Sequence, residues 1–514
     1  MADLALLGLD VGTSSGKATV LSADGRELGR GRIEYQLSYD ERGGVELDPA
    51  SVWAAVTSLI TEVTAQARAN GGTVGAISLS VSGDEATPVG ADGVHLRPCI
   101  MAMDNRTADL AESFSRQVGR RRIYEITGLP VHGMHPLLRL MWISEHEPDV
   151  FARTTKMLCW SELVTSLLGA PPVSDYSVAS RTMAFDIRKQ DWSGELLAAA
   201  GIDPALMPGL APSGTVIGEV PGPIAAGLGL APGTKIVTGG FDQAMAALGS
   251  GVIDSGDAGV GTGSWEGLVA VTREPVLTDR MLDAGYPFGC YVLPGRFFCL
   301  ASNPGGGSLL RWYKDTFGAE EVRLARRRGA DPFDVILEGL PAKPTGMIVL
   351  PHFQGSYSPW MDPAATGAIV GMQLATTRQD IVKAILEGTA LELRANIERL
   401  ERAGIAISSL SATGGGARSP LWLQLKADVT GKRVSAINVD ETGCFAAACT
   451  AGVGIGLFRS AEEPVRSWVH PVQTFEPDPA RHKIYDSIFA DYVQLCQAVS
   501  PVSHSVSARR RQAL

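Results

Sequence analysis

The stretch LGLDVGTSSGKATV, residues 8–21, joins an apolar run, a single acidic residue and a turn of glycine and hydroxyl residues, and then resumes an apolar pattern. This pattern predicts a buried strand over 4–11, a tight turn over 12–16 and a returning strand over 17–21. Asp10 then lies at the end of the first strand, beside the turn. Backbone N–H groups of such a turn can bind phosphate oxygens, and a lone carboxylate beside it suits Mg²⁺. An ordinary glycine-rich hairpin with a solvated aspartate would have the same pattern, so other segments must decide.

A second stretch repeats this layout about half a chain later. The residues DAGVGTGSWEGLVAV, 257–271, again place a Gly-Thr-Gly-Ser turn between two apolar runs. Two such hairpins predict two related domains, each presenting a phosphate-binding turn to a shared cleft. A further strand, predicted over 235–238, stops at Gly-Gly-Phe-Asp and is followed by a helical pattern. Asp242 therefore lies at a strand end, where α/β proteins commonly carry functional residues.

The composition limits the possible classes of protein. With 514 residues, 45% of them hydrophobic, the chain can bury two substantial cores. A net charge of −10 argues against a nucleic-acid partner, and the arginine clusters at 120–122 and 326–328 are typical of solvated helix faces. The 7 cysteines without C-x-x-C spacing predict reduced thiols in a cytoplasmic protein. We expect no signal peptide, and we expect the apolar stretch 443–458 to form a core helix, because a membrane helix needs roughly 20 residues.

Several motifs, found in the right order, resemble those of the FGGY family of carbohydrate kinases, which includes xylulokinase, glycerol kinase and gluconate kinase. The matching segments are DVGTSSGKA at 10–18 for the first phosphate turn, GGFDQA at 239–244 for the catalytic segment, GTGS at 261–264 for the second phosphate turn, GAIVGMQLATTRQDIVKAILEG at 367–388 for the C-terminal signature and GGGARSPLWLQLKAD at 414–428 for the adenosine loop. The N-terminal signature is met less cleanly at 134–148, where Arg139 stands at a position that is usually Lys.

The resemblance implies a fold and a division of the chain. The fold is α/β, a two-domain actin-like ATPase (ribonuclease-H-like) architecture with the nucleotide in the interdomain cleft. An N-terminal domain would span 1–250 and a C-terminal domain 251–498. The tail, 499–514, mixes Ser, Val and Arg without periodicity, and we expect it to be disordered.

The implied cofactors are ATP and Mg²⁺, because phosphoryl transfer needs phosphate clamps, a metal and a positioned acceptor. Asp10 would hold the metal directly or through water. The residues expected to contact the nucleotide are Thr13, Ser14, Ser15, Thr262 and Gly263 in the two turns and, by similarity to the family, Gly307, Arg311, Gly416 and Ser419. Alternatives remain for some of these: the triple glycine at 414–416 can be a simple turn, and Arg311 can pair with a surface carboxylate. Lys17 lacks the G-x-x-x-x-G-K-[ST] spacing of a Walker lysine, so we assign it a structural role.

By its match to the family, Asp242 would be the general base that takes the proton from the acceptor hydroxyl, with Gln243 beside it to bind a substrate hydroxyl. A lone Asp after a double glycine is otherwise more often a helix cap. The acceptor pocket departs from the best-known relatives, because Asp84 and Glu85 stand where xylulokinase-like members carry Met-His and glycerol kinases carry Arg-Glu. Carboxylates accept hydrogen bonds from hydroxyls and repel anions, so the pair predicts a neutral substrate.

Two further residues, Asp104 and Met134, fall where the family approaches its substrate, although Asp104 and Arg106 can instead form a structural bridge. We therefore predict an ATP-dependent kinase for a neutral sugar or polyol, such as a ketopentose or an alditol. Two alternatives remain: a kinase for a non-sugar hydroxylated signalling compound, and an actin-like ATPase that acts on a protein partner. A homodimer is compatible with the sequence, which does not define the oligomeric state.

Overall fold

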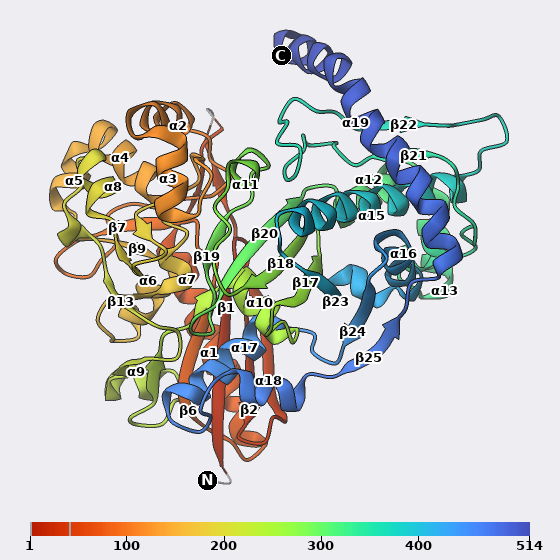
Figure 1. Cartoon of the computed structure of the whole chain (residues 1–514). Helices are drawn as coiled ribbons and strands as arrows, with labels where there is room; N and C mark the ends of the chain where they lie inside the picture. The colour runs from red at the N-terminus through yellow and green to blue at the C-terminus, as the bar shows by residue number, and fades with distance from the viewer. Residues whose placement is uncertain (1–2, 41–42, 514) are drawn as a thin grey trace.

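The computed structural model describes residues 3–40 and 43–513. The chain forms two α/β units, each built on a seven-stranded sheet (Figure 1). The strands of the first sheet are β1 (Leu4–Val11), β2 (Ser15–Ser22), β3 (Glu27–Glu34), β6 (Thr73–Val81), β14 (Val216–Glu219), β15 (Lys235–Val237) and β16 (Gly240–Phe241). Those of the second sheet are β17 (Gly256–Thr262), β18 (Glu266–Thr272), β19 (Phe288–Cys290), β20 (Phe297–Asn303), β23 (Ile407–Thr413), β24 (Arg433–Ile437) and β25 (Pro471–Phe475).

The two sheets share one central pattern. The first has the order β14-β15-β6-β1-β2-β3, with β16 also paired to β6, and the second has the order β19-β20-β18-β17-β23-β24-β25. In the first sheet, β1 forms an antiparallel hairpin with β2 and lies parallel to β6. In the second sheet, β17 forms an antiparallel hairpin with β18 and lies parallel to β23. The structural repeat predicted from the two Gly/Thr turns is confirmed.

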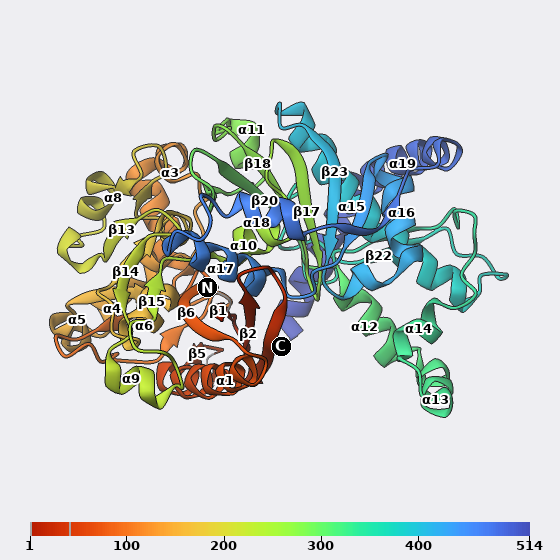
Figure 2. The same ribbon diagram turned by 90° about the horizontal axis from the view of Figure 1, so that it is seen from below.

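Helices cover both faces of the first sheet. Helix α1 (Pro49–Ala69) begins after Asp48, whose carboxylate accepts hydrogen bonds from the N–H groups of Ala50 and Ser51. It lies on one face of the sheet, and α17 (Thr442–Gly454) lies on the other (Figure 2). The contact with α17 is very close, because a Cβ atom at Gly8 of β1 would lie 1.8 Å from the carbonyl oxygen of Cys444.

This packing differs from the expected division of the chain. The segment 251–498 does not form one packed unit, because α17 and α18 (Glu462–Trp468) belong to the buried core of the first sheet. Helix α17 is rich in Ala and Gly, and only such small side chains allow the backbones of helix and strand to approach this closely. The chain therefore crosses between the two units more than once.

A lobe inserted between β6 and β14 lies beside the first sheet. Its short strands join those that follow β3 in a five-stranded sheet, β4-β5-β8-β7-β9. These strands are β4 (Ser38–Tyr39), β5 (Val45–Leu47), β7 (Ala86–Val89), β8 (Cys99–Ile100) and β9 (Lys156–Cys159). The helices are α2 (Ala108–Phe114), α3 (Arg120–Thr127), α4 (Pro136–His146), α5 (Pro148–Arg153), α6 (Trp160–Leu167), α7 (Tyr176–Ala179) and α8 (Gly194–Ala199), with α9 (Gly222–Gly227) following β14. Two small strand pairs complete this part of the chain, β10 (Val173–Asp175) with β13 (Gly209–Ala211) and β11 (Phe185–Asp186) with β12 (Asp191–Trp192).

The remaining helices connect or cover the two units. They are α10 (Asp242–Gly249), α11 (Asp279–Asp283), α12 (Gly307–Thr316), α13 (Ala319–Arg328), α14 (Pro332–Leu337), α15 (Arg378–Arg402), α16 (Pro420–Thr430) and α19 (Pro479–Ala513), with the strand pair β21 (Ile348–Leu350) and β22 (Ala368–Val370). The arginine clusters at 120–122 and 326–328 lie exposed on α3 and α13, as expected. All 7 cysteines are free, and within the described residues no helix combines the length and apolar character needed to cross a membrane.

The expectation of a disordered tail over 499–514 is wrong for its described part, because α19 continues to Ala513. Polar contacts hold this part of the helix to the loop before β22. The Ser503 hydroxyl is buried and lies 3.0 Å from the Thr366 hydroxyl, and His504 Nε2 lies 2.8 Å from a carboxylate oxygen of Asp362. A helix held by polar contacts has no apolar stripe, so its sequence shows no helical periodicity.

Candidate active site

Asp10 lies at the end of β1, beside the first turn, as predicted. It is paired in register with Lys17 of β2 on one side and with Ser80 of β6 on the other. The Ser80 hydroxyl donates to Asp10 Oδ1 at 2.6 Å, and a Cβ atom at Gly443 of α17 would lie 3.3 Å from the same oxygen. Burial raises the pKa of Asp10 above its ordinary value. Lys17 forms an ion pair with Glu441 at 2.7 Å, which fits the structural role assigned to it.

The first turn carries Thr13, Ser14 and Ser15, which are partly or fully exposed. Tyr35, just after β3, holds the turn through two hydrogen bonds to its backbone. Its hydroxyl donates to the carbonyl of Gly12, and its N–H donates to the carbonyl of Ser14 at 3.1 Å. The turn is therefore held by its backbone, and its hydroxyl side chains lie at the surface.

Asp242 is the first residue of α10 and follows β16 directly. Since β16 and β1 both pair with the end of β6, in register Phe241↔Val81 and Val11↔Val81, Asp242 and Asp10 flank the end of the same strand. Asp242 Oδ1 is buried and, within the residues that the structure describes, has no hydrogen-bond partner. Burial raises the pKa of Asp242 well above its ordinary value, and the charges of Asp10, Glu85 and Asp84 raise it further. Four carboxyl groups thus converge at one end of the first sheet.

Asp84 does not stand open to a ligand as the sequence suggests, because Arg181 binds both of its oxygens. Arg181 Nε lies 3.1 Å from Oδ1 and Nη2 lies 3.1 Å from Oδ2, and both side chains are nearly buried. Burial alone would raise the pKa of Asp84, but the charge of Arg181, with a contribution from His135, lowers it to about 2.

Arg181 comes from the turn after α7, and sequence reasoning missed it. Its guanidinium lies 5.0 Å from the centre of the Phe241 ring, next to Asp242. A Cβ atom at Gly83 would lie 2.9 Å from both Arg181 Cγ and Phe241 Cδ2, so a glycine is needed for the arginine to reach Asp84.

Glu85 is fully buried beside this pair. The Ser82 hydroxyl donates to Glu85 Oε2, while Oε1 has no hydrogen-bond partner among the described residues. Burial, together with the charge of Asp84, raises the pKa of Glu85. Arg139 of α4 fixes the backbone here, donating to the carbonyls of Asp84 and Ile100 at 2.6 Å each and of Met101 at 2.7 Å. Arg139, which stands where the family usually has Lys, therefore holds the backbone around Asp84 and Glu85 from a buried position.

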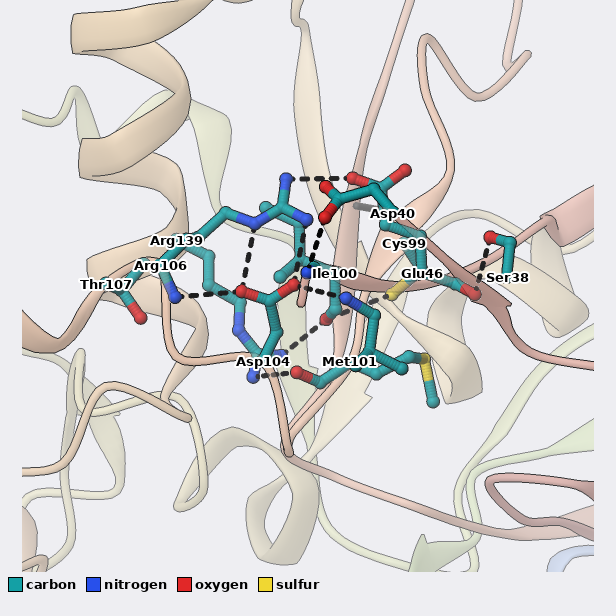
Figure 3. A network of polar contacts seen from close by, with 12 residues as sticks. Ser38, Asp40, Glu46, Cys99, Ile100, Met101, Asp104, Arg106, Thr107 and Arg139 are labelled. Atoms are coloured by element: carbon teal, nitrogen blue, oxygen red, sulfur yellow. Dashed lines mark hydrogen bonds and ion pairs between the residues drawn. The ribbon is translucent and has the colours of Figure 1, made fainter. Parts of the chain in front are cut away.

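Asp104 forms the structural bridge that was the alternative to a substrate contact (Figure 3). Its carboxylate accepts from the Val45 N–H at 2.6 Å and from the N–H, Nε and Nη2 of Arg106 at 2.8–2.9 Å. Burial would raise the pKa of Asp104, but these hydrogen bonds lower it. Because a carboxylate has about four acceptor positions, Asp104 has no acceptor left for a substrate hydroxyl. Met134 is half-buried before α4, and its role as a substrate contact stays a prediction.

In the second unit, three glycine-rich loops are in backbone contact. The N–H of Gly307 donates to the carbonyl of Gly263 at 2.8 Å, and a Cβ atom at Gly307 would lie 2.6 Å from that oxygen. A Cβ atom at Gly416 would lie 2.6 Å from Thr262 Cγ2. The structure therefore brings together Thr262, Gly263, Gly307 and Gly416, which come from three separate segments.

Three other predicted residues lie around these loops. The Ser419 hydroxyl accepts a hydrogen bond from the Trp422 N–H at 3.3 Å and so caps α16. Arg311 is exposed on α12 and, among the described residues, makes no ion pair. Gln243 reaches the second sheet, since a Cβ atom at Gly267 of β18 would lie 3.2 Å from its Oε1. Helix α10 thus carries Asp242 and Gln243 at the junction of the two units.

The residues present fit a magnesium ion of the kind that bridges nucleotide phosphates. Such an ion keeps several waters and uses one or two protein carboxylates together with phosphate oxygens. Asp10, partly buried at the end of β1 and hydrogen-bonded by the Ser80 hydroxyl, offers one such carboxylate beside the first turn. No group of three or more His, Cys, Asp or Glu side chains in the described part of the chain forms a cage for a metal, so phosphates would have to complete the site.

Two related sheets, a Gly/Thr turn on each and a carboxylate at the junction between them are features of an actin-like ATPase fold. Comparison with known families specifies it further: the chain belongs to the FGGY family of carbohydrate kinases. Residues 5–249 match the family's N-terminal domain, and residues 258–455 match its C-terminal domain.

Individual relatives agree with this assignment. The chain is 28% identical over 453 residues to a gluconokinase of Bacillus subtilis, covering 87% of each chain. It is 28% identical over 500 residues to an L-xylulose/3-keto-L-gulonate kinase of Escherichia coli, covering 96% of this chain and 97% of the relative. The crystal structure of a xylulose kinase from Rhodospirillum rubrum superposes with a TM-score of 0.88 at 26% identity, covering 97% of this chain and 100% of that one.

Proposed function

We propose that this carbohydrate kinase transfers the terminal phosphoryl group of ATP to a hydroxyl group of a neutral sugar or polyol, a ketopentose such as xylulose or an alditol, with Asp242 as the general base. The observation that carries the proposal is the unpartnered, buried Oδ1 of Asp242 at the junction of the two units. The raised pKa of Asp242 makes its carboxylate a stronger base than a solvated aspartate. The proton of the acceptor hydroxyl passes to Asp242, the hydroxyl oxygen bonds to the terminal phosphorus, and the bond from that phosphorus to the ADP oxygen breaks.

The two phosphate turns would hold the nucleotide from opposite units, the turn at 12–15 from the first and the turn at 261–264 from the second. Asp10 would hold Mg²⁺ directly or through water, and the ion, when bound, would neutralise charge that develops on the phosphate oxygens. Asp242 begins helix α10 at the junction of the two units, and in this proposal the acceptor hydroxyl approaches it there.

The charge of the pocket favours a neutral acceptor. Asp10, Asp84, Glu85 and Asp242 lie close enough to influence one another. The cations near them already have partners: Arg181 is paired with Asp84, Lys17 with Glu441, and Arg139 donates to backbone carbonyls. A sugar acid would bring a further negative charge into this site. The names of the relatives include a gluconokinase, an L-xylulose/3-keto-L-gulonate kinase and a xylulose kinase, so the choice between sugar acid and neutral sugar must be measured on this chain.

A coupled assay of ADP release over ketopentoses, aldoses, alditols and sugar acids tests the substrate class. A sugar acid as the best acceptor would contradict the proposal, and so would ATP hydrolysis that rises with unfolded proteins but not with any sugar. Asp242→Asn tests the mechanism: we expect turnover to fall by about 10²–10⁴ with ATP affinity nearly unchanged. Asp279→Asn, at the exposed start of α11, is the matched control. Near wild-type turnover of Asp242→Asn would remove Asp242 from the mechanism.

A further inference from the structure

The second phosphate turn rests on a buried ion pair that the reaction does not use. Glu266 stands at the start of β18, directly after the turn, and Lys426 projects from α16. The Lys426 ammonium donates to Glu266 Oε2, and the two side chains are only 1% and 2% exposed. Removing two charges from water costs more than such a pair usually returns, so its presence under a functional turn needs an explanation.

The pair fixes the hydroxyl of Thr262. The Thr262 hydroxyl donates its proton to Glu266 Oε2 at 2.9 Å and accepts from Lys426 Nζ at 2.5 Å. A hydroxyl has one proton to donate, so in this arrangement it has none for a phosphate oxygen. Thr262 therefore serves the turn through its position, and phosphate contacts from this turn would come from backbone N–H groups.

The same lysine also contributes to the packing around Gly416, at the start of the adenosine loop. Lys426 Nζ lies 5.1 Å from the centre of the Trp422 ring, one helical turn earlier on α16. A Cβ atom at Gly416 would lie 2.6 Å from Thr262 Cγ2 and 3.2 Å from Trp422 Cζ3, so the loop packs between the threonine and the tryptophan. Lys426 thus touches both segments that flank Gly416.

We propose that Glu266 and Lys426 are positioning residues of the nucleotide site, which set the spacing between the phosphate turn at 261–264 and the start of the adenosine loop, residues 414–419. The inference rests on the proposed function, which assigns these two loops to ATP. The pair acts through Thr262 and Trp422 and touches neither the nucleotide nor the acceptor. Its loss moves the loops relative to each other and weakens ATP binding without disturbing the acceptor pocket in the first unit.

The test measures ATP·Mg²⁺ binding to the full chain by calorimetry, together with the KM values for ATP and for the sugar. The main variant replaces both members, Glu266→Leu with Lys426→Met, because removing a buried pair as a whole leaves no unpaired charge and preserves stability. We expect a Tm near that of the wild type, ATP affinity weakened about 10- to 100-fold, and an unchanged KM for the sugar. Thr262→Val, which removes the bridging hydroxyl, is expected to weaken ATP binding in the same direction. Thr262→Ser keeps the hydroxyl and is expected to bind ATP more tightly than Thr262→Val.

Glu387→Gln is the control for general destabilisation. Glu387 is buried on α15 and accepts from Tyr485 at 2.9 Å, away from the three loops, so its variant lowers Tm and leaves the KM for ATP unchanged. Wild-type ATP affinity in the double variant, with Thr262→Val also unaffected, overturns the inference while the proposed function stands. If the wild-type protein does not bind ATP, the proposed function fails first. If the double variant does not fold, the ATP affinities of Thr262→Val and Thr262→Ser are compared. Weaker binding by Thr262→Val supports the inference, and equal binding by the two variants overturns it.

Discussion

The bidentate pair between Asp84 and Arg181 gives a quantitative prediction about stability. Arg181→Met removes the guanidinium and leaves the buried Asp84 carboxylate unpaired. The pKa of Asp84 is lowered from 3.8 to about 2 in the folded protein, and a shift of this size corresponds to roughly 2 kcal/mol of stabilisation of the charged form. Because the variant also leaves a carboxylate buried without its partner, we expect a total loss of about 3–5 kcal/mol.

Thermal unfolding at neutral pH measures this loss. A change of 1 kcal/mol shifts Tm by about 2–4 °C for a unit of 150–250 residues, so Arg181→Met is expected to lower Tm by roughly 10 °C. Arg122→Met is the matched control, because Arg122 makes a similar two-point pair with Glu195 on the surface, at 2.6 and 2.8 Å, with both side chains about half exposed. That variant is expected to change Tm little, since exposed pairs contribute little.

The pH dependence provides a second check with a definite sign. A depressed carboxylate pKa contributes stability that is present above 3.8 and is lost as the pH falls through about 2. In Arg181→Met the unpaired Asp84 regains a raised pKa through burial, so protonation at mildly acidic pH relieves part of the penalty, and the Tm gap to the wild type narrows. Adding Asp84→Leu to Arg181→Met is expected to restore most of the lost stability. A Tm of Arg181→Met close to that of the wild type, or a gap that widens toward acid pH, would refute this account of the pair.

Three further predictions concern the general base, the closure of the two units and the acceptor pocket. Since the pKa of Asp242 is raised and the base must be deprotonated, kcat/KM is expected to rise with pH through that pKa; a profile that stays flat down to the pH at which the protein unfolds would argue against Asp242 as the base. Because the turns at 12–15 and 261–264 belong to different units, the units are expected to close around ATP·Mg²⁺ and substrate. Small-angle scattering checks this, and an unchanged radius of gyration with both ligands bound counts against it. Glu85→Gln keeps the shape of the side chain but weakens its acceptor strength, so a higher KM and lower kcat/KM for the true substrate are expected; a gain with a sugar acid would show that the pocket is wrongly assigned.

Local signals predicted much of the fold correctly. The strand of β1 and the turn after it depend on residues that are neighbours in sequence, and such patterns report directly on local structure. The starts of α1 and α15 carry signals of the same local kind, because Asp48 caps the first and Thr377 and Asp380 form a complete capping box at the second.

The polar partnerships could not be predicted in the same way. Asp84 and Arg181 are 97 residues apart, and Lys426 is 160 residues from Glu266, so only the folded chain brings each pair together. A weak signal exists for Lys426: it stands at a buried position of an otherwise apolar helix face, and a lysine at such a position needs a partner. Nothing in the local sequence says which residue that partner is.

The close approach of α17 to β1 has a consequence for the order in which the protein can fold. The face of β1 that includes Gly8 is covered by a helix that ends at Gly454, so a ribosome must synthesise most of the chain before the first sheet can complete its core. Until then, the nascent first unit exposes an apolar sheet face, and such a face is prone to aggregation. A fragment that stops at residue 250 lacks α17, so this apolar face of the first sheet would stay uncovered. This enzyme is therefore a poor candidate for separation into two independently folding halves.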